Sequence, residues 1–160
     1  MLMKRAKLSV VVRLEHGGDV DFPDKVEISI PCFICVRTDR TVILNLGQDE
    51  GICAKQKHSI RGRLLEKKIE QNGGIASVTY RLEYVFKPFI DLKYGHPASP
   101  LPTWARVEFK VRCSKCGLVV ESGTQSNISR PWEKRCPCGS TLFKETEEMP
   151  RIEMEESEAR

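Results

Sequence analysis

Apolar and polar residues alternate along several stretches of the chain, which is the pattern of β-strands that bury one face. The alternation is clearest over 77–86 (SVTYRLEYVF) and 104–112 (WARVEFKVR). Segments rich in β-branched residues at 7–15, 25–30 and 41–46 also favour strands. The pattern therefore predicts a mainly β fold with little helix.

Residues 59–71 fit two different structures. Their many Glu, Lys, Leu and Gln residues favour a helix, and Gly73 is a suitable helix stop. The apolar residues, however, would spread over half of the helix circumference, and Gly62 is unfavourable near a helix start. Asn72 and Gly73 together form a hairpin turn signal ahead of another strand-like segment. We expect a hairpin, and the alternative is an α+β fold with one short helix at 59–71.

The segment 95–103 contains three prolines and interrupts any regular element. We expect it to link a β-rich domain over 1–94 to a smaller domain over 104–145. Residues 146–160 are rich in glutamate and contain no aromatic residue. We therefore expect them to form a disordered acidic tail.

The composition is that of an ordinary globular protein, with 40% hydrophobic and 30% charged residues in a chain of 160. The longest unbroken apolar run, Cys32–Val36, is far shorter than the ~20 residues that cross a membrane. The start of the chain also lacks the long apolar stretch of a secretory signal. We expect a cytoplasmic protein, or a nuclear one in a eukaryote, that is not secreted and has no membrane partner.

Seven cysteines are unusual for a chain of this kind, and four of them form two close pairs. The pairs are Cys113-x2-Cys116 and Cys136-x-Cys138, and a glycine directly follows each pair. Two cysteines this close can direct both sulfurs at one cation if the backbone turns tightly, and glycine tolerates the positive φ of such a turn. The spacing therefore predicts a metal site with four thiolate ligands.

The segment 107–145 contains, in order, an expected strand, the motif CSKCG, an expected hairpin, the motif CPCG and an expected final strand. In this order of features it resembles the zinc-ribbon family. One residue, instead of the commoner two, separates Cys136 from Cys138, which leaves the ribbon subfamily open. The resemblance implies one structural Zn²⁺ and folding that is coupled to its binding. Rubredoxins bind iron with similar turns, so sulfur ligation alone does not exclude iron.

A second Zn²⁺ site is a further prediction from the remaining cysteines. The segment 27–35 repeats the pattern of apolar and cysteine positions in 108–116, and His58 lies close to Cys53 in the sequence. This second set, with three cysteines and one histidine, would be Cys32, Cys35, Cys53 and His58. The alternative is a packed pair of cysteines without a metal, since buried cysteines behave as small hydrophobic residues.

The formal net charge is +4, and the acidic tail leaves the rest of the chain more basic than this value. A basic body favours a polyanion partner, although thiolate-bound zinc would offset part of the charge. In an extended strand, Lys57, Arg61, Arg63 and Lys67 would share one face. The candidate nucleic-acid contacts are Lys55, Lys57, Arg61, Arg63, Arg130, Trp132 and Lys134. The alternative is a solvated sheet face, with Trp132 covering a small core.

Both predicted metal sites are closed by protein ligands, which is typical of structural and not of catalytic zinc. The chain also lacks a phosphate-binding glycine loop and a Ser-His-Asp order. We therefore expect no enzymatic activity and no small-molecule substrate. The resemblance and the basic body favour nucleic-acid association, in transcription or its regulation, and the alternative is a metal-stapled protein–protein adaptor.

Overall fold

A computed structural model describes residues 4–16, 18–30, 41–51, 53, 60–86, 89–90, 97–98, 102–126, 133–139, 141–145 and 151–158. These residues form β-strands and no helix, which confirms the mainly β prediction. The strands are β1 (Lys4–His16), β2 (Gly18–Asp21), β3 (Lys25–Ser29), β4 (Val42–Asn45), β5 (Asp49–Gly51), β6 (Arg61–Asn72) and β7 (Ile75–Phe86). They continue with β8 (Phe89–Ile90), β9 (Pro97–Ala98), β10 (Trp104–Cys113), β11 (Val119–Gln125), β12 (Glu133–Arg135), β13 (Thr141–Glu145) and β14 (Arg151–Glu158). Among the described residues, no helix has the length and apolarity that crossing a membrane requires.

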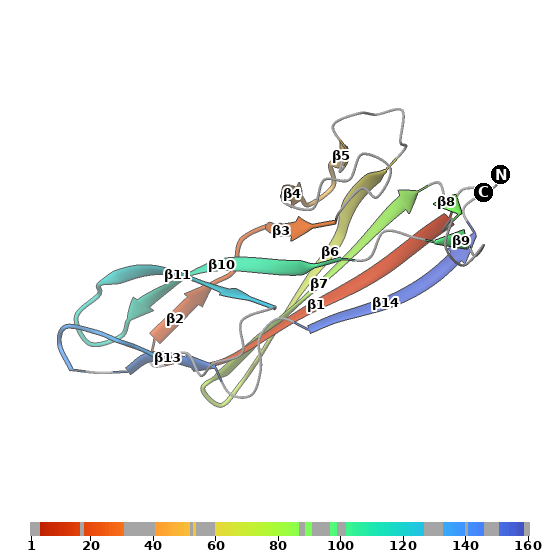
Figure 1. Ribbon diagram of the computed structural model, residues 1–160. Coiled ribbons are helices and arrows are strands. Elements are labelled where there is room, and N and C mark those ends of the chain that lie inside the picture. Colours follow the sequence, from red (N-terminus) through yellow and green to blue (C-terminus); the bar gives the residue numbers. More distant parts are fainter. Residues whose placement is uncertain are drawn as a thin grey trace.

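The larger sheet has seven strands in the order β12-β13-β1-β7-β6-β5, and β14 also pairs with β1 (Figure 1). β7 runs along one edge of β1 from Lys4 to Glu15. The other edge of β1 is shared, because β14 pairs with Lys4–Val11 and β13 with Leu14–His16. All of these pairings are antiparallel.

The smaller sheet has five strands, in the order β11-β10-β3-β4, with β2 also paired to β10. β2 and β3 follow one another along a single edge of β10, where β3 pairs with residues 104–106 and β2 with residues 110–113. The chain between β2 and β3 leaves this edge of β10, so neither strand pairs with Glu108. A separate two-stranded sheet contains β8 and β9.

One hydrophobic cluster buries a face of each of the two main sheets. Every second residue of β7 and of β10 is buried, as their alternating sequences predicted. The two sheets also meet through polar contacts, since the Tyr80 hydroxyl of β7 donates to the Pro23 carbonyl at 2.6 Å. On the smaller sheet, the rings of Phe22 and Phe109 lie 6.0 Å apart in the core.

The ambiguous segment at 59–71 is a strand over its described part, because β6 and β7 form a long antiparallel hairpin. Asn72 pairs with Ile75, which leaves Gly73 and Gly74 as the two turn residues, with φ of 55° and 87°. Positive φ at both positions is the geometry of a type I′ turn, which matches the twist of the flanking strands. The preferred hairpin is confirmed, and the short helix is excluded over Arg61–Asn72.

The structure differs from the expected disordered tail over residues 151–158, which form β14. Its Ile152 and Met154 lie opposite Val10 and Leu8 of β1 in the register. The high glutamate content suggested disorder, but Ile152 and Met154 stand at alternate positions, which is the pattern of a strand. β14 thereby covers an edge of β1 that would otherwise be exposed.

Candidate metal centre

The first pair of cysteines lies at the turn between β10 and β11. Cys113 is the last residue of β10, and its backbone N–H donates to the Leu118 carbonyl at 2.8 Å. The Gly117 N–H donates back to the Cys113 carbonyl at 2.9 Å, and Gly117 has a φ of 76°. The predicted glycine therefore permits the tight turn that brings Cys116 back beside Cys113.

The second pair lies between β12 and β13. The Gly139 N–H donates to the Cys136 carbonyl at 2.9 Å, and Gly139 has a φ of 95°. This bond closes a β-turn, so the single residue between the cysteines gives a tighter turn than the first pair has. We call the two turns, 113–117 and 136–139, the metal knuckles.

The four knuckle sulfurs form one compact group, within 4.8 Å of one another. Cys116 Sγ lies 3.3 Å from Cys136 Sγ, and Cys113 Sγ lies 3.7 Å from Cys138 Sγ. Four sulfurs at about 2.3 Å from a tetrahedral Zn²⁺ would be about 3.8 Å apart, whereas a disulfide bond is only about 2.05 Å long. The group is therefore the size of a tetrahedral thiolate site and could hold a metal ion.

The sulfur group is buried on one side and open on the other. Cys113 and Cys136 are 1% and 4% exposed and belong to the hydrophobic cluster, whereas Cys116 and Cys138 are exposed. The backbone N–H of Cys138 lowers the pKa of the Cys136 thiol, but burial and hydrogen bonds with the other three sulfurs raise it to about 12. A cation that binds here must therefore displace protons from crowded thiols.

The two metal knuckles belong to different sheets, because β10 and β11 lie in the smaller sheet and β12 and β13 in the larger one. They lie at the corner where the chain passes from β1 to β2 (Figure 1). β13 pairs with Leu14–His16 on one side of this corner, and Cys113 pairs with Gly18 on the other. An ion bound by all four sulfurs would consequently join the two sheets at this end of the molecule.

The second predicted set is only partly within the described residues. Cys53 is buried in the hydrophobic cluster, whereas Cys32, Cys35 and His58 lie outside the described residues. The site with three cysteines and one histidine stays a prediction.

The predicted basic row on β6 is broken by an irregularity in the pairing with β7. Arg61 and Arg63 share the outer, exposed face of the larger sheet, but a bulge between Leu64 and Glu66 reverses the later positions. Lys67 therefore points to the opposite face, where it pairs with Asp24 and donates to the Phe22 carbonyl at 3.2 Å. The expectation that Lys67 would extend the row was wrong, because the sequence does not reveal the extra residue.

Most of the other candidate nucleic-acid contacts lie outside the described residues. Lys55, Lys57, Arg130 and Trp132 lie outside the described residues, and Lys134 belongs to β12. Their proposed role stays a prediction.

Several basic side chains on the outer face of the larger sheet have an acidic neighbour. The pairs are Arg5–Glu83 at 3.6 Å, Arg63–Asp49 at 3.9 Å, Lys68–Glu70 at 3.6 Å and Arg81–Glu66 at 3.9 Å. The last three of these pairs are exposed and add little to stability, but all four lower the local excess of positive charge.

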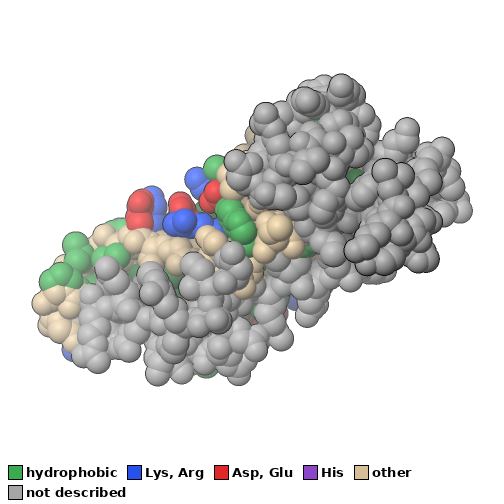
Figure 2. Space-filling view, viewed as in Figure 1, with side chains coloured by type: hydrophobic (Ala, Val, Ile, Leu, Met, Phe, Trp, Pro, Cys, Tyr) green, Lys and Arg blue, Asp and Glu red, His purple; other side chains and the backbone are tan. Residues whose placement is uncertain are grey.

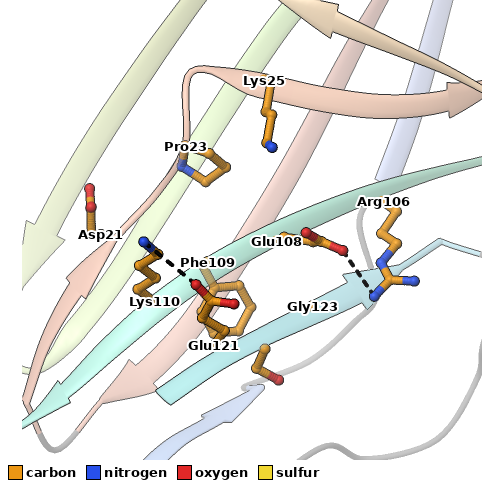
Figure 3. Close-up of a pocket in the computed structure, with 10 residues that line it drawn as sticks. Asp21, Pro23, Lys25, Arg106, Glu108, Phe109, Lys110, Glu121 and Gly123 are labelled. Atoms are coloured by element: carbon orange, nitrogen blue, oxygen red, sulfur yellow. Dashed lines mark ion pairs between the residues drawn. The ribbon is translucent and has the colours of Figure 1, made fainter. Parts of the chain in front are cut away.

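Acidic and basic side chains alternate on the outer face of the smaller sheet (Figure 2). This face has a hollow of about 590 Å³ above the break between β2 and β3 (Figure 3). Arg106 pairs with Glu108 at 3.1 Å, and Lys110 pairs with Glu121 at 3.5 Å. Local sequence patterns could not predict the hollow, because it depends on which strands pair with β10. Its charges balance one another, so it favours neither a cationic nor an anionic ligand.

Comparison of the chain with protein-family models, with curated proteins and with solved structures finds no match.

Proposed function

We propose that this is a zinc-binding, non-enzymatic protein in which a four-cysteine centre of zinc-ribbon type joins two β-sheets. The observation that carries the proposal is the group of four cysteine sulfurs within 4.8 Å of one another. The positive φ of the glycine after each pair supports it, as does the placement of one knuckle in each sheet. Cys113, Cys116, Cys136 and Cys138 would supply every ligand, and such a closed site has a structural role.

Metal analysis of the untagged protein tests this proposal. Zinc bound in at least equimolar amount, and lost from a Cys116→Ser variant, is the expected result. Iron in place of zinc would make the centre rubredoxin-like. Protein that binds neither metal when refolded with an excess of each would overturn the proposal.

We further propose that the protein associates with nucleic acid. The net charge of +4 and the zinc-ribbon resemblance support this role. The second candidate is a protein–protein adaptor, and the ion pairs on the outer face of the larger sheet favour it, because they leave less positive charge for phosphates. Phosphate contacts make affinity fall steeply with salt. Binding to random-sequence DNA or RNA that weakens with salt supports the first role, and no binding at low ionic strength supports the adaptor.

A further inference from the structure

Two short sulfur–sulfur contacts connect one metal knuckle to the other. Cys116 Sγ of the first knuckle lies 3.3 Å from Cys136 Sγ of the second, and Cys113 Sγ lies 3.7 Å from Cys138 Sγ. Each contact also joins an exposed cysteine to a buried one. Each pair therefore combines a sulfur that a small oxidant can reach with a shielded sulfur at short distance.

We propose that the centre is a peroxide-responsive switch, in which oxidation releases the metal and replaces it with two disulfides, Cys116–Cys136 and Cys113–Cys138. This inference rests on the proposed zinc centre and adds a regulation to it. Because both disulfides would cross from one sheet to the other, the two sheets would stay joined after the ion has left.

The reaction balances for each pair of cysteines. The exposed thiolate attacks one peroxide oxygen and becomes a sulfenic acid, and the other oxygen leaves as hydroxide. The buried thiolate then attacks the sulfenic sulfur, an S–S bond forms, and a second hydroxide leaves. Each sulfur loses one electron, the peroxide accepts two, and two protons convert the hydroxides to water. Two such reactions remove all four ligands and release Zn²⁺.

The geometry favours these pairings over bridges within a knuckle. A Cys136–Cys138 bridge would have to close around the single residue Pro137, inside a turn that the Gly139 N–H already holds. The crossing pairs need their sulfurs to approach from 3.3 and 3.7 Å to about 2.05 Å, which is a small movement for exposed cysteines.

The test treats the full-length, zinc-loaded protein with hydrogen peroxide and follows released zinc with a chromogenic chelator. Disulfides are then mapped by mass spectrometry of proteolytic peptides. We expect about two peroxide molecules to be consumed for each zinc ion that this centre releases, with Cys116 linked to Cys136 and Cys113 to Cys138. Cys53 is buried and lies outside the sulfur group, so it should form no disulfide with the four knuckle cysteines.

Hydrogen exchange provides a second readout that needs no variant. The oxidised, zinc-free protein should keep amide protection in β11 and β13, whereas the reduced, zinc-free protein should lose it. Zinc retained under peroxide, bridges within a knuckle, or equal loss of protection in the two zinc-free forms would each overturn the switch. Failure of the reduced protein to bind zinc would instead overturn the proposed centre itself.

Discussion

Replacing Cys138 with serine tests whether the metal joins the two sheets. Cys138 is exposed, so the change leaves no buried cavity and acts mainly through the lost ligand. Structural zinc sites contribute about 10–16 kcal/mol of apparent binding free energy, so one ligand of four accounts for about 2.5–4 kcal/mol. Every 1.4 kcal/mol is a factor of ten, so amide exchange at the metal end should accelerate by roughly a hundredfold or more.

Zinc content and hydrogen exchange together measure this effect. The Cys138→Ser protein should lose zinc to a chelator that leaves the wild type loaded. Exchange should accelerate in β10 and β11 of the smaller sheet and also in β13 and the end of β1 in the larger sheet. Lys115→Ala is the matched control, because Lys115 is an exposed knuckle residue that is not a ligand.

Two outcomes would refute this reasoning. If the variant kept stoichiometric zinc with wild-type affinity, Cys138 would not be a ligand. If exchange accelerated in β10 and β11 alone, while β13 stayed protected, the ion would stabilise one turn and would not join the sheets.

Three further predictions concern the turns, the core and the protons of the centre. Gly117→Ala should destabilise the metal end by about 1–2 kcal/mol, because Gly117 has a φ of 76°. In chemical denaturation, Gly123→Ala should lower the free energy of unfolding by less than Gly117→Ala does. Gly123 has no positive φ, and its added Cβ would meet the flexible Arg106 side chain at 3.2 Å. Burial, and then two nearby aspartates, raise the pKa of Tyr80. Wild-type stability should therefore fall as the pH rises above about 10, and Tyr80→Phe should flatten this alkaline loss in thermal melts. Because zinc must displace thiol protons, chelator competition should show weaker zinc binding at acidic than at neutral pH.

The sequence predicted individual strands and turns well, because these depend on local patterns. The alternation over 104–112 corresponds to β10, and the Asn72-Gly73 signal marks the hairpin, whose turn residues are Gly73 and Gly74. The knuckle glycines likewise predicted positive φ. Local patterns were not sufficient where the outcome depended on distant segments. Examples are β14, which is a strand because β1 offers an edge, and the bulge between Leu64 and Glu66.

The assignment of the metal knuckles to two different sheets was also beyond local patterns. The resemblance to a zinc ribbon describes each cysteine turn, but the strands beside the two turns lie in separate sheets. There β10 pairs with β2 and β3, and β13 pairs with β1, all of which come from the start of the chain. A strand acquires its partners from the whole fold, so the spacing of cysteines could predict the ligands without predicting which segments they join.

The pairing pattern also indicates that zinc loss should loosen one end of the protein and leave the remainder folded. At the corner between β1 and β2, β13 is held by three register pairs, at Leu14–His16, and β2 by four, whereas β1 and β7 pair from Lys4 to Glu15. Short strand pairings have little stability of their own. The ion therefore acts where these pairings are short, while the core around Tyr80 and Leu82 is held by the long pairings of β7 with β1 and β6. The β6–β7 hairpin should keep its amide protection in every zinc-free form, and its loss would mean that the two sheets fold as one metal-dependent unit.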